Sequence, residues 1–424
     1  MDKTLTSSIR SINEFEYTGK TVILRLDINS PIDPDTKRIV NDNRIKMSVP
    51  TVKYLLGQKA KLVILAHQGD TLDYHNLIPL QEHAERLSKL LGEKIRYVDD
   101  VAGPAAREAI RNLKPGEAVL LGNLRYLTEE ISTFEDAVKL KPEEMMNTYL
   151  IRNLAPLADY YVNDAFSAAH RNAPSMVAFQ ELLPTAGGYI LVNEIDALNR
   201  VVKSPGKPAV FVLGGAKISD AFGMLKEVLE KGTADNILAC GVTGEIMLLA
   251  QGMSIGERKE RFIKDRSLDV FIPSAKDYLY RYPGKIIAPV DLAYEKDGER
   301  LEISVTDLPK DELFMDIGSR TIEIFKDYVN NAGTIFVNGP AGAYENKIFE
   351  KGTREIWNAI ANAKGFSVIG GGDTVSAASR FIDLNKINFV CTAGGAMIRY
   401  ISGKKLPLVE AMVKASQKHI SKDN

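Results

Sequence analysis

Short apolar runs alternate with longer amphipathic segments along the whole chain, and this alternation is what most constrains the fold. Runs of about four to six apolar residues with β-branched members are typical of strands buried on both faces. Strands that alternate with helices predict parallel sheets covered by helices, an α/β fold. The helices expected most clearly cover residues 80–91 and 319–330. The expected strands are 21–26, 62–66, 118–121, 160–162, 209–213, 236–239, 286–288, 334–337, 366–369 and 389–391.

Length and charge narrow the class of protein. The chain has 424 residues, and at about 150 residues per domain this predicts two or three domains. A formal net charge of −1 excludes a strongly basic nucleic-acid coat and an acidic tail protein. No apolar stretch approaches the length of about 18 residues that a membrane span needs, and the N-terminus lacks the apolar region of a signal peptide. We therefore expect no nucleic-acid or membrane partner.

Two cysteines, Cys240 and Cys391, lie far apart in the sequence. They form neither a disulfide framework nor a zinc pattern, which suits a reducing compartment. We expect a cytoplasmic protein.

Residues 186–202 predict one long helix that nearly bisects the chain, followed by a segment with two prolines. This helix is interpreted either as an ordinary crossover or as a connection between two domains.

Polar and cationic side chains follow the expected strands of the first half. Ligands of open α/β sheets bind beyond the carboxyl ends of the strands, so these positions are candidates for a site. Arginine makes bidentate contacts with phosphate and carboxylate, which predicts a pocket for a small, highly charged anion. A surface location for each charge is the alternative. The residues in question are Arg25, Asp27, Ile28, Asn29, His67, Gln68, Gly69, Asn123, Arg125, Asn163, Asp164, His170 and Arg171.

Glycines follow the expected strands of the second half. Glycine lets the backbone approach a bulky ligand, and the amides of a helix N-terminus bind phosphate. Lys217 adds a positive charge, and Asp373 could hold Mg²⁺. This half is interpreted as a nucleotide site, although each glycine pair alone is typical of a tight turn. The strand ends are residues 214–217, 241–244, 289–291, 338–342, 370–374 and 392–395.

Standard nucleotide fingerprints and common catalytic motifs are missing. Residues 19–21 resemble the end of a P-loop, but Glu14 stands where glycine is required and a strand follows. We find no dinucleotide motif, no nucleophile elbow and no histidine pair with zinc spacing. A kinase whose acceptor is a carboxylate needs no general base, because that acceptor is already ionised at neutral pH. Its catalysis is positioning plus charge stabilisation, which fits this residue set.

The ordered motifs resemble those of the phosphoglycerate kinase family, most closely its archaeal branch. The resemblance covers nearly the whole chain. In the first half it rests on Arg25, Asp27 and Asn29, on Asp42 and Arg44, on His67 and Gly69, and on residues 123–125, 162–166 and 169–171. In the second half it rests on residues 213–217, 316–318, 338–342, 370–374 and 394–396.

The resemblance implies two Rossmann-like, doubly wound parallel-sheet domains joined by a hinge helix. The expected parts are a phosphoglycerate-binding domain (1–188), the hinge helix (186–202), a nucleotide-binding domain (203–400) and a tail (401–424) that returns to the first domain. It also implies reversible, Mg²⁺-dependent phosphoryl transfer between 1,3-bisphosphoglycerate and ADP, giving 3-phosphoglycerate and ATP. A monomer or a homodimer is expected.

The resemblance further assigns roles to residues. Arg44, Lys217, Gly394 and Gly395 are expected to stabilise the transferring phosphoryl group, and Asp373 to coordinate Mg²⁺. The substrate-binding set is Arg25, Asp27, Ile28, Asn29, Arg44, His67, Gln68, Gly69, Asp70, Arg125, His170 and Arg171. The nucleotide-binding set is Gly214, Gly215, Lys217, Gly241, Asn338, Pro340, Glu345, Gly371, Gly372, Asp373 and Thr374.

Several positions depart from the family pattern, and they keep two alternatives open. Asp70 replaces a cation, Ala221, Gly122, Ala173 and Ala393 replace other customary residues, and Cys240 and Val242 interrupt a glycine run. One alternative is a divergent kinase for another small carboxylate or acyl phosphate. The other is a catalytically silent protein that binds a nucleotide or metabolite. Arg44, Lys217 and Asp373 are all present, which argues against the silent protein.

Overall fold

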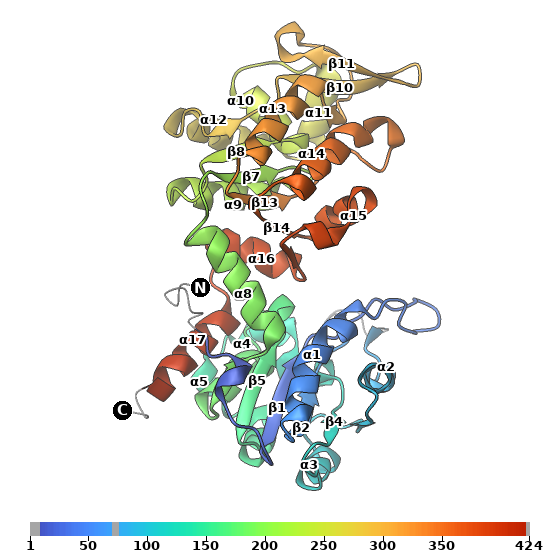
Figure 1. Cartoon of the computed structure of the whole chain (residues 1–424), viewed down its shortest axis with the longest axis vertical. Helices are drawn as coiled ribbons and strands as arrows, with labels where there is room; N and C mark the ends of the chain where they lie inside the picture. Colours follow the sequence, from blue (N-terminus) through green and yellow to red (C-terminus); the bar gives the residue numbers. More distant parts are fainter. Residues whose placement is uncertain (1–8, 70–75, 421–424) are drawn as a thin grey trace. The chain divides into compact units, whose positions relative to one another are not determined.

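The structure is a computed structural model that describes residues 9–69 and 76–420. The chain folds into two compact units. Unit 1 comprises Met1–Asp196 with Lys405–Asn424, and unit 2 comprises Ala197–Lys404. Each unit is built around a six-stranded sheet (Figure 1).

The sheet of unit 1 is parallel throughout, with the order β3-β4-β2-β1-β5-β6. Its direction of winding reverses between β1 and β5, and ligands of open α/β sheets bind at such a switch point. The strands are β1 (Thr21–Leu26), β2 (Lys61–Leu65), β3 (Ile95–Tyr97), β4 (Ala118–Leu120), β5 (Tyr160–Asp164) and β6 (Thr185–Gly187). The helices are α1 (Asn43–Gly57), α2 (Gln81–Leu91), α3 (Pro104–Arg111), α4 (Ser132–Val138), α5 (Pro142–Met145), α6 (Tyr149–Leu154) and α7 (Pro174–Val177).

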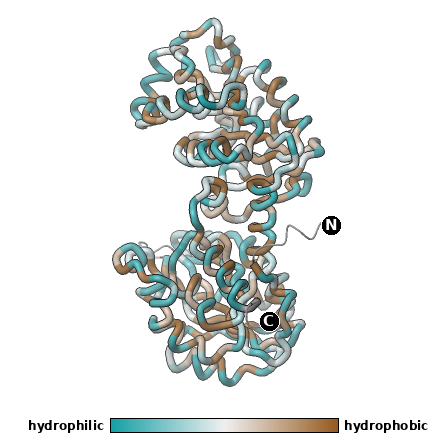
Figure 2. The backbone as a smooth tube through the Cα atoms, turned by 90° about the vertical axis from the view of Figure 1, so that its left-hand side faces the viewer, coloured by the Kyte–Doolittle hydropathy of each residue, from teal (hydrophilic) through white to brown (hydrophobic). Residues whose placement is uncertain are grey.

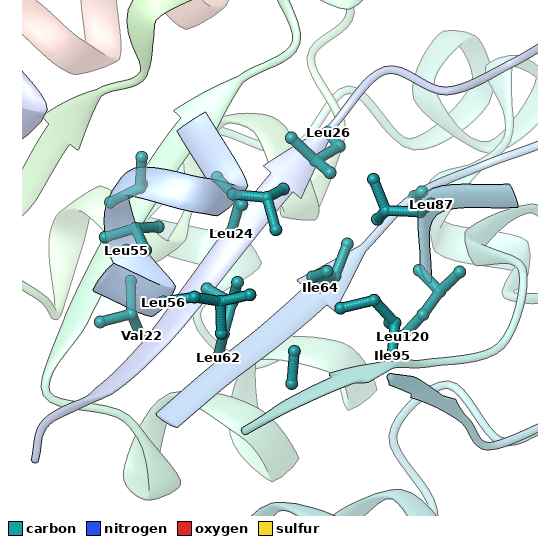
Figure 3. Close-up of a cluster of buried hydrophobic side chains, with 14 of the residues drawn as sticks. Val22, Leu24, Leu26, Leu55, Leu56, Leu62, Ile64, Leu87, Ile95 and Leu120 are labelled. Carbon is teal, nitrogen blue, oxygen red and sulfur yellow. The ribbon is translucent and has the colours of Figure 1, made fainter. Parts of the chain in front are cut away.

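Aliphatic side chains fill the space between this sheet and its helices. Alternate residues of β1, Val22 and Leu24, pack with Leu55 of α1, and all three are fully buried (Figure 3). Leu87 of α2 extends the same cluster over β2 and β4. The hydropathy-coloured trace shows hydrophobic and hydrophilic stretches interspersed along the chain in both units (Figure 2). Burial of such side chains is the dominant favourable term in folding, so the sheet is a rigid platform for the loops at its edge.

The sheet of unit 2 is also parallel, with the order β15-β14-β13-β7-β8-β9. Its winding reverses between β13 and β7. The strands are β7 (Ala209–Leu213), β8 (Asn236–Ala239), β9 (Ile286–Ile287), β13 (Thr334–Asn338), β14 (Phe366–Gly370) and β15 (Phe389–Cys391). The helices are α9 (Ile218–Glu230), α10 (Gly241–Ala250), α11 (Glu257–Asp265), α12 (Ile272–Arg281), α13 (Ser319–Asn330), α14 (Glu350–Asn362), α15 (Gly372–Phe381) and α16 (Gly394–Ile401).

A second, antiparallel sheet in unit 2 was not expected from the sequence. It has the order β11-β10-β12, from β10 (Asp291–Lys296), β11 (Glu299–Ser304) and β12 (Asp316–Ile317). Asp297 and Gly298 join β10 to β11, and both have positive φ. An Asp-Gly pair with this conformation is the preferred two-residue hairpin turn. The hairpin was missed because its strands carry many charges and lack the apolar run used to find the others.

The long helix α8 (Tyr189–Val202) contributes residues to both units. The sequence predicted this helix from residue 186, which is wrong by three residues. Ala186 and Gly187 instead pair with Val162 and Asn163 as the last strand of unit 1. The C-terminal helix α17 (Pro407–Ile420) packs on α7 and β6 of unit 1. Lys414 of α17 anchors it there through Glu143 of α5 and Glu181.

All ten expected strands are present within one or two residues of their predicted bounds, which confirms the α/β fold class. The helices expected at 80–91 and 319–330 correspond to α2 and α13. β3 and β6 were missed because each is short, lies at a sheet edge and lacks a continuous apolar run. Among the described residues, no helix has the length and apolar character needed to cross a bilayer.

Candidate active site

The strand ends of unit 1 carry the predicted cationic residues. Arg25 belongs to β1, His67 follows β2, and Arg125 lies in the short helix η4 (Leu124–Tyr126) after β4. Arg171 follows β5 after the short helix η7 (Phe166–Ala168). Because the strands are parallel, these ends share one edge of the sheet. The fold therefore gathers residues that are up to 146 positions apart, from Arg25 to Arg171.

Arg25 and His67 form the buried centre of this group. Arg25 Nη2 lies 2.9 Å from Nδ1 of His67, and both side chains are buried. Burial lowers the pKa of His67 well below its usual value of 6.5. Repulsion from four arginines lowers the pKa further; in decreasing order of effect they are Arg25, Arg125, Arg44 and Arg171. The imidazole is thus neutral, and four cations converge on it.

Arg44 and Asp27 form the second part of the group. Arg44, in the first turn of α1, pairs with the carboxylate of Asp27, which also accepts a hydrogen bond from Ser167 Oγ. Asp27 Oδ1 accepts from the backbone N–H of Asn29 at 3.2 Å, and Asn29 Oδ1 accepts from Gly69 N at 3.1 Å. The Arg44 side chain stays 40% exposed. It is therefore oriented by Asp27 and still accessible to a ligand.

Arg125 and Arg171 are held by the segment that follows η4. Arg125 Nη1 donates to the backbone oxygen of Glu130, and Arg171 Nε donates to Glu135 Oε2 at 2.7 Å. Arg171 Nη2 is buried and has no hydrogen-bond partner within the described part of the chain. A buried guanidinium nitrogen without an acceptor costs free energy. An anionic ligand at this edge would supply that acceptor.

Four other predicted substrate residues are placed differently. The Ile28 side chain is fully buried in the core cluster, so only its backbone can meet a ligand. Gln68 uses its amide within the protein, accepting from Ser30 N at 2.9 Å and donating to Ser30 O at 3.0 Å. His170 is partly buried, directly before Arg171. Asp70 lies outside the described residues.

Glycines bring the strand ends of unit 2 into close contact at its switch point. Gly214 N donates to Asn338 O at 2.9 Å and Gly215 N donates to Pro340 O at 2.8 Å. Two backbone hydrogen bonds therefore join the loops after β7 and β13. A Cβ atom on Gly214 would lie 2.3 Å from Pro340 O. Gly241 has φ +54°, and a Cβ there would lie 2.9 Å from Gly215 N. These glycines are required by the packing of the loops on one another.

Gly372 and Gly395 differ from the other glycines of this edge. A Cβ on either residue would meet no atom within 4 Å. Gly372 opens α15 and Gly395 lies in the first turn of α16. A Cβ on Gly394 would lie 2.6 Å from Gly371 Cα, so the two helix N-termini are adjacent. Helix N-termini with exposed amides bind phosphate, and open space in front of glycine admits one.

Charged and polar side chains surround these helix ends. Lys217 Nζ lies 3.0 Å from Asp373 Oδ2, and the two side chains are 71% and 68% exposed. Thr374 Oγ1 accepts from Gly339 N at 2.9 Å, and Asn338 Nδ2 donates to Gly370 O at 3.2 Å. Glu345 is exposed. Burial is the largest cause that raises the pKa of Tyr344, and the negative charges of Glu345 and Asp373 raise it further. The two carboxylates therefore lie near the same phenol.

The positions that depart from the family pattern are mostly buried. Ala221 of α9 is fully buried and Ala173 is 3% exposed, so neither position presents a charge to the site. Ala393 is 5% exposed directly before α16. Gly122 packs against the backbone of Asp100, where a Cβ would lie 3.1 Å from Asp100 N.

Four residues that contact the predicted site were not found from the sequence. Ser167 donates to Asp27, and Glu135 pairs with Arg171. Ser175 accepts from Arg25 and donates in turn to Glu130. The Glu129-Glu130 pair stands just after the Asn-Leu-Arg motif, which is the only local hint. The two serines carry no periodic or compositional signal at all.

The arrangement suits phosphoryl transfer to an ionised acceptor. Unit 1 offers several guanidinium groups around a neutral imidazole, and these can bind phosphate and carboxylate. Unit 2 offers adjacent helix N-termini, a lysine and an aspartate, which can bind a nucleoside polyphosphate. Within the described residues, no cluster of three or more His, Cys, Asp or Glu could hold a metal ion by itself.

Comparisons with known proteins agree with this chemistry. A family model described as "Phosphoglycerate kinase" matches residues 12–404. The chain is 43% identical to a phosphoglycerate kinase of Methanococcus maripaludis, covering 96% of this chain and 99% of the relative. It is 39% identical to one of Methanothermus fervidus, covering 96% and 98%. The crystal structure of the phosphoglycerate kinase of Pyrococcus horikoshii OT3 superposes with a TM-score of 0.82 at 36% identity, covering 97% and 100%. The chain belongs to the phosphoglycerate kinase family.

Proposed function

We propose that this protein catalyses reversible phosphoryl transfer between 1,3-bisphosphoglycerate and ADP, giving 3-phosphoglycerate and ATP. The observation that carries the proposal is the gathering of Arg25, Arg44, Arg125 and Arg171 near the buried His67, which Arg25 contacts directly. 3-Phosphoglycerate bears a phosphate and a carboxylate, and four guanidinium groups match that charge. The nucleotide binds at the glycine-rich edge of unit 2.

In the proposed mechanism the acceptor needs no general base, because a carboxylate is ionised at neutral pH. Arg25, Arg125 and Arg171 bind the phosphoglycerate, with Asp27, Asn29, His67 and Gly69 completing the pocket. Arg44, Lys217 and the amides at Gly394 and Gly395 stabilise the charge on the transferring phosphoryl group. Direct transfer requires the two ligands to meet, and α8 is the segment about which we propose that the units close.

The nucleotide pocket of the proposal uses the loops after β7, β8 and β13. Glu345 binds the ribose, and the segment near Gly241 and Pro340 lines the adenine. Thr374, Asn338 and the amides of Gly371 and Gly372 meet the phosphates, beside Gly214 and Gly215. The proposal treats ATP and ADP as co-substrates.

Mg²⁺ is part of the proposal, and the residues present fit it. Mg²⁺ is usually held by one or two carboxylates together with substrate phosphates and waters. Asp373 is an exposed carboxylate at the N-terminus of α15, where it pairs with Lys217. When bound with the nucleotide, Mg²⁺ would neutralise charge on the phosphates. Asp373 would hold the ion, and the neighbouring Lys217 supplies positive charge for the phosphoryl group.

A coupled assay of ATP consumption with 3-phosphoglycerate and Mg²⁺ tests the proposal. We expect turnover that requires both substrates and is lost on chelation of Mg²⁺. Turnover with 2-phosphoglycerate or another small acid, and none with 3-phosphoglycerate, would show a different acceptor. Calorimetric binding of both ligands without turnover would show a silent binding protein. We further propose a cytoplasmic location and a monomer or homodimer, which sedimentation tests.

A further inference from the structure

The segment after η4 carries two carboxylates that no predicted site includes. We name residues 128–138 the bracing segment; it contains the short helix η5 (Thr128–Glu130) and α4. Glu130 lies at the end of η5 and Glu135 within α4. Each faces a different arginine of unit 1. The bracing segment thus contacts the arginines directly or through Ser175, but none of its residues is in the predicted substrate-binding set.

Glu130 is joined to Arg25 through one serine. Its side chain is buried, and its two carboxylate oxygens accept from Ser175 N and Ser175 Oγ, each at 2.6 Å. Ser175 Oγ has one hydrogen, and this hydrogen is given to Glu130. The hydroxyl can therefore act only as acceptor towards Arg25 Nε, which lies 3.3 Å away. The carboxylate fixes the direction of the serine hydroxyl, and the hydroxyl accepts from the third nitrogen of a guanidinium whose other two contact Leu26 O and His67 Nδ1.

The same glutamate also contacts Arg125, whose Nη1 donates to its backbone oxygen. Burial raises the pKa of Glu130, while the hydrogen bonds from Ser175 and the charges of Arg25 and Arg125 lower it. Glu135 repeats the arrangement, since it accepts from Arg171 Nε and from Asn172 N, each at 2.7 Å. Three arginines are thus braced by one short segment.

We infer that Glu130 is a positioning residue that acts through Ser175 to hold Arg25 in the orientation required for the anionic substrate. The inference rests on the proposed function, because it names Arg25 as a ligand of phosphoglycerate. A guanidinium that is already oriented loses less side-chain entropy when the anion binds. Without the Glu130–Ser175 link, Arg25 keeps its charge and its contacts with Leu26 O and His67 Nδ1, but it loses the acceptor that holds Nε. The loss should appear in the affinity for phosphoglycerate and not in that for the nucleotide.

The variants E130Q and S175A each break one bond of the link. In E130Q, an amide N–H₂ replaces one carboxylate oxygen, so the serine hydroxyl loses its acceptor. We expect calorimetry to show 3-phosphoglycerate binding about tenfold weaker in either variant, the size of one lost charge-assisted hydrogen bond. The double variant should bind no more weakly than the weaker single variant, because both remove the same link. Binding of ADP should stay unchanged.

E129Q is the matched control. Glu129 precedes Glu130 and likewise accepts two hydrogen bonds, but both come from the backbone, from Tyr149 N at 3.2 Å and Leu150 N at 2.7 Å. Both bonds tie it to the start of α6, and neither involves Ser175 or an arginine. E129Q removes the same negative charge as E130Q but leaves the link to Arg25 intact. We therefore expect 3-phosphoglycerate affinity within twofold of wild type. S175T keeps the hydroxyl and should restore affinity relative to S175A. Thermal melts show whether each variant folds.

A measurement on the free protein separates this inference from the proposed function. The Arg25 Nε proton, followed by ¹⁵N NMR, should exchange with water faster in E130Q and S175A than in wild type and E129Q. If wild type fails to bind 3-phosphoglycerate, the proposed function is wrong, and the exchange rate still decides the positioning role. Unchanged exchange in folded E130Q overturns the inference. Equal losses of phosphoglycerate and ADP affinity also overturn it, since a general structural role would produce them.

Discussion

Arg25 Nη2 lies 2.9 Å from Nδ1 of His67, in a part of unit 1 where both side chains are buried. An arginine nitrogen can only donate, so Nδ1 is the acceptor and the proton of the neutral ring resides on Nε2. The buried pair thus places an uncharged donor among four guanidinium groups. The site gains a hydrogen bond for an anion without a further buried charge.

The first prediction follows from the depressed pKa of His67. Because the folded-state pKa lies well below the unfolded value near 6.5, His67 contributes stability above pH 6.5 that is lost as pH falls below it. NMR of the imidazole nitrogens should show one tautomer with no titration between about pH 8 and pH 6. The H67Q variant identifies the signal and should flatten the fall in unfolding free energy below pH 6.5. Titration of His67 with an ordinary midpoint would contradict the prediction.

The second prediction concerns Arg44, which pairs with Asp27 and remains accessible. R44A should lower kcat by at least about 10²-fold, the usual effect of removing one donor that stabilises transition-state charge. Nucleotide affinity should be unchanged. R38A is the control, because Arg38 is 72% exposed and pairs distantly, at 3.9 Å, with Glu82. A kcat for R44A within threefold of wild type would contradict the proposal that Arg44 stabilises the transferring phosphoryl group.

The third prediction tests the open space in front of two glycines. In G372A and G395A the added methyl meets no protein atom within 4 Å, so folding should be unaffected. If nucleotide phosphates approach this backbone, the methyl blocks them, and ATP binding should weaken by at least about tenfold. G57A, where a Cβ also meets nothing within 4 Å, should change neither property. Normal ATP affinity in both variants would show that the phosphates do not bind in front of Gly372 and Gly395.

The fourth prediction concerns Asp164, which lies at the N-terminus of α8 and accepts from Leu191 N at 3.0 Å. Burial raises the pKa of Asp164 to about 7. Its folded-state pKa lies above the unfolded value near 3.9, so its stabilising contribution is complete below pH 3.9 and is lost as pH rises towards 7. From pH 5 to pH 8, the stability of D164N should therefore rise relative to wild type by about 2 to 3 kcal/mol. Urea melts at both pH values measure this difference, and a difference independent of pH would refute it.

Much of the fold was predictable because each parallel strand carries its own signal. A strand buried on both faces, such as β1 or β7, must be apolar throughout, and this requirement is local in sequence. The hairpin of β10 and β11 escaped because one side of it is exposed to water and its residues are mixed in character. Its Asp297-Gly298 turn was nevertheless readable.

The candidate site divides in the same way between local and non-local information. The residues at the strand ends follow from the positions of the strands. The sequence by itself therefore determined that Arg25, His67 and two further arginines, Arg125 and Arg171, share one edge of the first sheet. It also determined that glycines lie at the strand ends of the second sheet. Only the tertiary structure decided how these groups are held. Ser175 and Glu130 are 45 residues apart, and no local pattern records that one orients the other. Hydrogen bonds between distant segments depend on how whole elements pack, and packing is specified by the entire chain.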